Sequence, residues 1–184
     1  MRKLFLVAGL TAAFMLLVVA ASAEKTSFAG TWGLDKTKSQ GLSQRMMGAD
    51  KVTLTITQDD KTISLDTKVE GGQPPAGGGG GGGGMGGGRG PAGPTTYNLD
   101  GHEVTSDVTF GQNTGKRTLK ATMSGGTLEL MNKTSFTGPD GTERVNATTQ
   151  KLSLAGDGKT LTVVTHREGG QQPTPDSTAV YNKQ

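Results

Sequence analysis

The segment "KVTLTITQDDKTISLDTKVE", Lys51 to Glu70, decides the fold of this chain. Apolar and polar residues alternate through both halves of it, and Val52, Leu54 and Ile56 share one face of the first half while threonines occupy the other. Alternation with a period of two is typical of a half-buried β-strand, and the "QDDK" in the middle is typical of a tight reversal. The segment therefore predicts two antiparallel strands joined by a hairpin turn.

The same alternation recurs along the chain, and turn sequences such as "LDGH", "SGGT" and "AGDGK" separate the segments. It predicts ten strands, at residues 28–34, 51–58, 61–70, 95–99, 103–110, 115–123, 127–136, 142–154, 159–167 and 178–183. The apolar positions change phase between Val145 and Leu152, which predicts a β-bulge near Thr149. A short helix is expected only within Lys38 to Gly48. We expect an all-β fold, an antiparallel up-and-down meander that closes into a barrel of about 8 to 10 strands.

The N-terminal sequence has the features of a secretory signal. Arg2 and Lys3 precede an uncharged apolar run, and the run ends in the small residues "ASA" at 21–23. This predicts a cleaved signal peptide at 1–23, a barrel domain at 24–184, and a periplasmic or secreted protein. The alternative is an uncleaved anchor, because the run is nearly long enough to span a bilayer. The chain has no cysteine, which excludes a lipid-modified cysteine and disulfides.

Net charge argues against a nucleic-acid partner. Without Arg2 and Lys3 the chain carries 17 basic and 16 acidic side chains, a formal charge of +1. Nucleic-acid binding needs a basic patch that displaces counterions from phosphates. We expect no nucleic-acid partner, and membrane contact only during export.

The lengths of the predicted connections are very unequal. If each strand pairs with the next, the long connections 35–50, 71–94, 111–114, 137–141 and 168–177 all lie at one rim of the barrel, and the short ones lie at the other. Binding functions concentrate on loops that a rigid scaffold carries. The asymmetry therefore indicates a binding protein.

A glycine-rich stretch, "GQPPAGGGGGGGGMGGGRGPAGPTTY" at 72–97, covers almost all of one of these long connections and the start of the next predicted strand. A phosphate-binding loop needs glycines at fixed spacings followed by a helix, whereas prolines and a strand follow here. An unbroken run such as Gly77 to Gly84 loses too much backbone entropy to hold one conformation. We therefore expect a disordered loop at 71–94, not a nucleotide site.

The opening strand "FAGTWGL", residues 28–34, followed by a long connection and a meander, resembles the calycin group of lipocalins and fatty-acid-binding proteins. The resemblance rests on the Gly30-Thr31-Trp32 motif and implies a lipocalin-like barrel that carries a small molecule. It also implies that Gly30 and Trp32 are structural, with Trp32 at the closed end beneath a basic residue of the last strand. Lys183 is the counterpart that this sequence offers, with Lys25 as the alternative.

On the face of the strands that is otherwise apolar, the residues become polar toward the rim with the long connections. This predicts an interior that is apolar at the end with the short connections, its floor, and basic at the other end, its mouth. Such an interior suits an amphiphilic or lipid-like acid whose tail goes down while its head stays near two arginines, because guanidinium groups bind carboxylates in bidentate fashion. The alternative is that strand ends near a rim are polar because water reaches them. The candidate ligand-binding residues are Arg117, Arg167, Asn132, Thr134, Phe110 and Phe136.

No arrangement of residues in the sequence indicates catalysis. His102 and His166 fall on separate segments, no cysteine is present, and no nucleophile can be matched with a base. We expect a non-enzymatic protein without metal or cofactor. Two other classes stay open: an outer-membrane β-barrel, which also has long loops at one rim, and a ligand-free structural or interaction protein of the cell envelope.

Overall fold

The computed structural model describes residues 26–71, 93–110, 113–138, 141–169 and 175–184. The predicted signal peptide and the glycine run lie outside these ranges. The elements are β1 (Gly30–Gln40), α1 (Gln44–Gly48), β2 (Lys51–Gln58), β3 (Thr62–Glu70), β4 (Thr95–Asn98), β5 (Val104–Phe110), β6 (Asn113–Ser124), β7 (Thr127–Thr137), β8 (Glu143–Leu154), β9 (Thr160–Glu168) and β10 (Ser177–Lys183).

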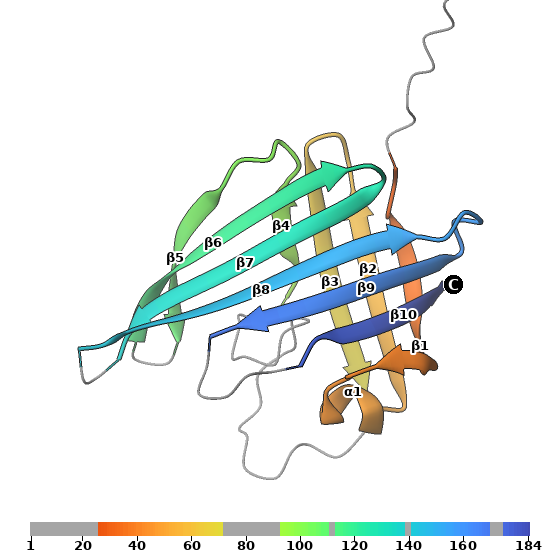
Figure 1. The fold of residues 1–184 in the computed structure, drawn as a ribbon, viewed down its shortest axis with the longest axis horizontal. Coiled ribbons are helices and arrows are strands. Elements are labelled where there is room, and N and C mark those ends of the chain that lie inside the picture. The colour runs from red at the N-terminus through yellow and green to blue at the C-terminus, as the bar shows by residue number, and fades with distance from the viewer. Residues whose placement is uncertain (1–25, 72–92, 111–112, 139–140, 170–174) are drawn as a thin grey trace, which may run out of the picture.

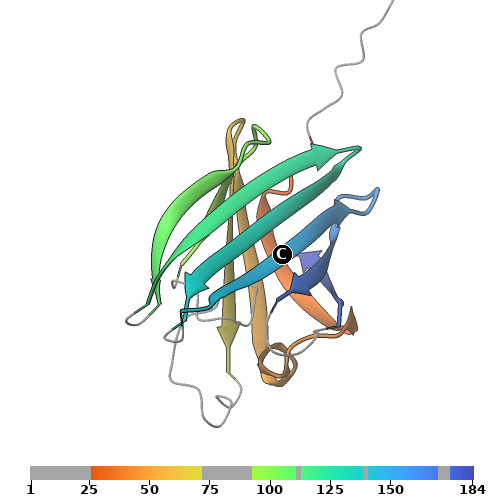
Figure 2. The same ribbon diagram turned by 60° about the vertical axis from the view of Figure 1, so that its left-hand side comes forward.

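All ten strands belong to one antiparallel sheet with the order β4-β3-β2-β1-β10-β9-β8-β7-β6-β5. The sheet rolls up into a nearly closed barrel, with β6 to β10 crossing in front of β2 and β3 in the view of Figure 1. Figure 2 shows how the sheet curves so that β4 and β5 come round toward each other. The predicted all-β antiparallel meander of about 8 to 10 strands in a barrel is confirmed, and its shape is compatible with a lipocalin-like barrel.

One pairing differs from the expected order. β4 and β5 are consecutive in the chain, yet they are the two edges of the sheet, and the barrel is joined instead through β1 and β10. The residues of β4 approach β6 rather than β5. The barrel therefore has a seam between β4 and β5 that backbone hydrogen bonds do not close.

Two local expectations need correction. The predicted bulge near Thr149 is absent, because β8 stays in register with β7 and β9 through Met131, Thr149 and His166. The phase of the apolar residues changes because Val145 lies on the outer face and is 39% exposed, so no extra residue is needed. The helix is shorter than expected, at Gln44–Gly48, because residues 38–40 extend β1.

A packed floor fills the closed end of the barrel. Its largest side chains have no more than 2% of their surface exposed: Trp32, Tyr181, Phe28, Leu54, Ile56, Ile63, Leu128, Leu130, Leu152, Leu161 and Val163. Residues 26–29 cross this end, where Phe28 N donates to Gln58 Oε1 at 2.8 Å and Trp32 Nε1 donates to Phe28 O at 3.0 Å. Gln58 Nε2 in turn donates to Thr26 O at 3.2 Å. The N-terminal segment thus forms part of the floor.

The described strand ends that the longer connections join, such as those of β1 and β2 and of β9 and β10, lie at the opposite rim. α1 lies at this rim, below β2 and β3 in Figure 1. We call the end of the barrel bounded by these connections the mouth.

Candidate ligand-binding site in the barrel mouth

The interior becomes polar in steps from the floor to the mouth. Three successive rows of inward-facing residues cross β7, β8 and β9, and each is set by the strand register. From floor to mouth the rows are Leu128–Leu152–Val163, Leu130–Gln150–Thr165 and Asn132–Thr148–Arg167. The interior therefore has a sharp level at which apolar packing gives way to hydrogen-bonding side chains.

Arg117 projects from β6 into the polar half of the barrel. Its Nε donates to Asn132 Oδ1 at 3.2 Å, and its Nη2 donates to Thr95 Oγ1 at 3.1 Å. Thr95 belongs to β4, so Arg117 joins the two sides of the seam. The sequence did not single out Thr95, because β4 was expected to pair with β5 and not to face β6.

Two other donors in this half of the barrel have no acceptor. Gln150 is 6% exposed, and its Nε2 is buried without a hydrogen-bond partner. The Nε of Arg167, one row nearer the mouth, is also buried and unpaired. A buried donor without an acceptor costs about 1 to 3 kcal/mol, so these two atoms favour any acceptor that reaches them. The sequence analysis did not single out Gln150, although it shares the inward phase of Leu152, because it is a polar residue next to the position at which a bulge was predicted.

The interior is electropositive. No Asp or Glu occupies an inward-facing position on the described strands, whereas Arg117 and Arg167 both do. The acidic residues lie on the outer faces, where Glu129 pairs with Lys151 at 3.3 Å and Asp107 pairs with Lys116 at 3.3 Å. The positive charge inside is therefore not balanced by a neighbouring inward-facing carboxylate.

The structure brings some of the predicted site residues together. Asn132 bonds to Arg117, and Thr134 faces Arg117 across the β6–β7 ladder. Arg167 belongs to the same polar layer, but β7 and β8 separate its strand from that of Arg117.

The two predicted aromatic residues lie closer to the rim. Phe136 is half-buried near the mouth and faces Gly115, where a Cβ would collide with the backbone of Ser135. The backbone of Phe110 pairs with Asn113, and the side chain of Phe110 lies outside the described residues.

The expected path for an apolar tail is blocked. The floor side chains have essentially no exposed surface, so they adjoin no space large enough for a water molecule. Val104 and Met123, on the inward faces of β5 and β6, are 43% and 37% exposed. Val104 is exposed because it lies on the edge strand β5, and Met123 because it lies next to the β6–β7 turn. The floor therefore offers no room for an apolar tail.

Trp32 and Lys183 lie opposite each other at the closed end, on β1 and β10. The Nζ of Lys183 lies 5.4 Å from the centroid of the Trp32 ring, within the range of a cation–π contact. Gly30 has a φ of 146°, and a Cβ there would lie 3.2 Å from Cε of Lys183. A glycine at this position thus leaves room for the lysine to cover the indole.

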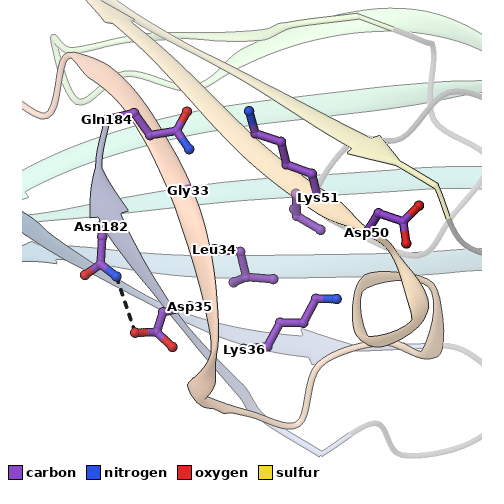
Figure 3. Close-up of a pocket in the computed structure, with 9 residues that line it drawn as sticks. Gly33, Leu34, Asp35, Lys36, Asp50, Lys51, Asn182 and Gln184 are labelled. Atoms are coloured by element: carbon purple, nitrogen blue, oxygen red, sulfur yellow. Dashed lines mark hydrogen bonds between the residues drawn. The ribbon is translucent and has the colours of Figure 1, made fainter.

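A cavity of about 420 Å³ on the outer surface lies where β1 leaves β2 (Figure 3). The ladder between these strands ends at Gly33 and Thr53, and the strands diverge beyond this pair. Two of the charged groups that line the cavity have partners: Lys36 Nζ donates to the carbonyl oxygens of Met47 and Ala49, and Asp35 accepts from Asn182 at 3.3 Å.

The two histidines have surface roles. Asp176 Oδ1 lies 2.5 Å from His166 Nδ1, and this hydrogen bond raises the pKa of His166 above its usual value. Glu168 adds to the effect from 3.4 Å. His102 lies 3.6 Å from Asp100, in the connection from β4 to β5. Within the described ranges, no group of three or more His, Asp or Glu side chains could hold a metal ion.

Neither a scan against protein-family models nor a search of curated proteins found a match to this chain. Among the described residues, no helix has the length and apolar character needed to cross a membrane.

Proposed function

We propose that this protein is an exported, non-enzymatic carrier that binds a small amphiphilic acid in the polar half of its barrel. The observation that carries the proposal is the electropositive interior, with Arg117 and Arg167 facing inward and no inward-facing carboxylate on the described strands. Charge inside a protein is costly unless it is paired, so this interior favours an anionic ligand. Small-molecule sites commonly occur in the mouths of β-barrels.

The outer face supports a barrel surrounded by water over one surrounded by lipid. Its strands carry ion pairs such as Glu129 with Lys151 and Asp107 with Lys116. A membrane barrel needs an apolar outer band, and charges facing lipid are costly. The second candidate, a ligand-free structural protein, is favoured by a different observation, namely that the floor is packed without space.

Titration with a fluorescent fatty acid and with the alcohol of the same chain length separates these functions. We expect the acid to bind more tightly, and Arg167→Met to weaken acid binding by about 1.5 to 3 kcal/mol, the usual range for a charge-assisted hydrogen bond. Lys116→Met is the control for loss of one positive charge, because Lys116 lies on the outer face of β6 and pairs with Asp107 there. Mass spectrometry of the recovered acid should show it unchanged.

If the wild-type protein binds neither compound, the carrier proposal is wrong and the ligand-free function is favoured. Export has its own measurement. Intact mass of the protein purified from cells should correspond to a chain that begins at residue 24, and a chain that retains residues 1–23 would contradict export by a cleaved signal.

A further inference from the structure

We infer that two copies of this protein associate through β5, whose free edge pairs antiparallel with the free edge of β5 in the second copy. The two sheets then continue into each other across a twofold axis at Ser106. This interface lies on the outside of the barrel, so it does not depend on whether the interior binds an acid.

β5 is the edge of the sheet that presents an open row of backbone groups. It pairs with β6 on one side only, and Figures 1 and 2 show it at the margin of the barrel. The other edge strand, β4, has four residues and lies against β6, where Thr95 accepts from Arg117. β5 has seven residues, and Val104 to Asp107 and Thr109 are exposed. β5 is therefore the longer and more accessible edge.

The hairpin from β5 to β6 determines which backbone groups of β5 are free. Its ladder closes on the pair Phe110–Asn113, with two residues between them. This pair is of the hydrogen-bonded kind, because two intervening residues cannot exchange the flanking bonds that the other kind requires. Since the two kinds alternate, Thr105, Asp107 and Thr109 direct their N–H and C=O groups away from β6. Within the described part of the chain, no backbone group bonds to them there.

β5 lacks the devices that protect exposed strand edges from pairing. Its sequence, "VTSDVTF", contains no proline and no lysine, and its ladder with β6 continues without a bulge. Its one charged residue, Asp107, lies on the outer face and pairs with Lys116 at 3.3 Å. Natural edge strands carry such devices to prevent pairing with other chains, so their absence favours a strand that has a partner.

The side chains of β5 favour one register for pairing with a second copy. A register centred on Asp107 places two carboxylates directly opposite each other, which is destabilising. The register centred on Ser106 instead places Thr105 opposite Asp107, so that a hydroxyl group faces each carboxylate. It also places Val104, which is 43% exposed, opposite Val108. A register centred on Val108 pairs as many residues of β5 but leaves Val104 exposed.

This interface closes at two copies, because the same strand is used on both sides. Pairing of β5 with β4 of another copy would be head-to-tail and would leave an edge free for the next copy. In the proposed dimer, Thr105 and Asp107 of opposite copies exchange two backbone hydrogen bonds, and the twofold axis repeats the pair. One pair of strands buries less area than a standard stable interface, so we expect a dimer that dissociates on dilution.

Sedimentation velocity of the purified protein, from about 5 to about 500 μM, measures the association. We expect the sedimentation coefficient to rise with concentration from that of a monomer to that of a dimer. Thr105→Pro should raise the dissociation constant about tenfold, because proline removes an N–H that points to the free edge and leaves the ladder with β6 intact.

Thr96→Pro on β4 is the matched control. Leu99 N donates to Lys61 O, so the N–H of Thr96 also points away from its own ladder with β3. The substitution therefore makes the same chemical change on the other edge of the sheet. It should leave the dissociation constant within about twofold of the wild-type value.

The register has a separate test, because the chain has no cysteine and one introduced thiol can report it. In the proposed register, Ser106 faces Ser106 of the second copy as a non-hydrogen-bonded pair, with Cα atoms about 4.5 Å apart, a distance that a disulfide can span. On mild oxidation, Ser106→Cys should form linked dimers about tenfold faster than Val108→Cys, whose thiol faces Val104. A mixture of Val104→Cys and Val108→Cys should link faster than either variant alone.

Three results would overturn the inference: a protein that stays monomeric throughout this range, linkage of Ser106→Cys no faster than that of Val108→Cys, or equal weakening by Thr105→Pro and Thr96→Pro. Circular dichroism checks that both proline variants are folded, and the disulfide measurement needs neither of them. Titration with the fatty acid has no bearing on these results, so the dimer and the carrier function are tested separately.

Discussion

Trp32 lies at the bottom of the floor and has no exposed surface. Its indole donates to Phe28 O at 3.0 Å and is covered by Lys183. We expect Trp32→Ala to lower the free energy of unfolding by about 3 to 5 kcal/mol, because it opens a large cavity in packed surroundings. Urea denaturation followed by circular dichroism measures the loss. Trp32→Phe, which keeps an aromatic ring, should lose less. Solvent-like emission from wild-type Trp32, or a loss below about 1 kcal/mol, would contradict a buried indole.

His166 makes the stability of the folded protein depend on pH. Its hydrogen bond with Asp176, and more weakly the contact with Glu168, raise its pKa above 6.5 in the folded protein. The protonated form is therefore favoured by folding. The stabilisation is fully present below the unfolded value of 6.5 and is lost as the pH rises through the folded pKa.

Melting temperatures of the wild type and of His166→Gln, measured across this range at low salt, should differ most at acidic pH. The difference should shrink as the pH rises. It should also be small, because His166 is half-exposed and salt screens surface pairs. A difference that is constant with pH would show that the contact with Asp176 does not depend on protonation.

The N-terminal segment at 26–29 is the element that completes the floor. Gln58 holds it with both ends of its side-chain amide, accepting from Phe28 N and donating to Thr26 O. We expect Gln58→Ala to lower the free energy of unfolding by about 1 to 3 kcal/mol, the contribution of two hydrogen bonds. Amide hydrogen exchange at Phe28 should accelerate more than exchange in β8. Gln58→Glu is the control, because it keeps the acceptor for Phe28 N. Unchanged exchange at Phe28 in Gln58→Ala would mean that packing alone holds the segment.

Alternation located the ten strands because each has one face inside and one outside. Alternation gave wrong predictions in two places where a residue's polarity does not match the face on which it lies. β1 continues to Gln40 through "KTKSQ", which has no apolar alternation, and Ser39 Oγ replaces a backbone partner by accepting from Val180 N at 2.9 Å. In β8, Val145 is apolar although it faces outward. The alternation therefore predicted that it faces inward and required a bulge, which the register excludes.

At the scale of the whole molecule, the sequence predicted that one half of the barrel interior is polar. It did not predict how far the packed apolar floor extends toward that half. Arg117, Asn132 and Thr134 lie near one another because all three follow the inward phase of β6 and β7, and their role in ligand binding stays a prediction. The seam contact with Thr95 and the packed floor depend on how far the barrel closes and how its side chains fill it. Neither property is a local feature of sequence, because both arise from residues far apart in the chain.

The pairing of β1 with β10 has a consequence for how the chain folds in time. It is the link in the sheet between two meanders, β1 to β4 and β5 to β10, and it joins residues such as Ser39 and Val180 that are 141 positions apart. Each meander consists of local hairpins, which form fast, whereas contacts of such long range form slowly. β10 also follows every other strand in the chain. Until β10 has been synthesised and has paired with β1, one edge of β1 has no strand partner. The time before this pairing forms is therefore the period in which the protein is most prone to aggregate.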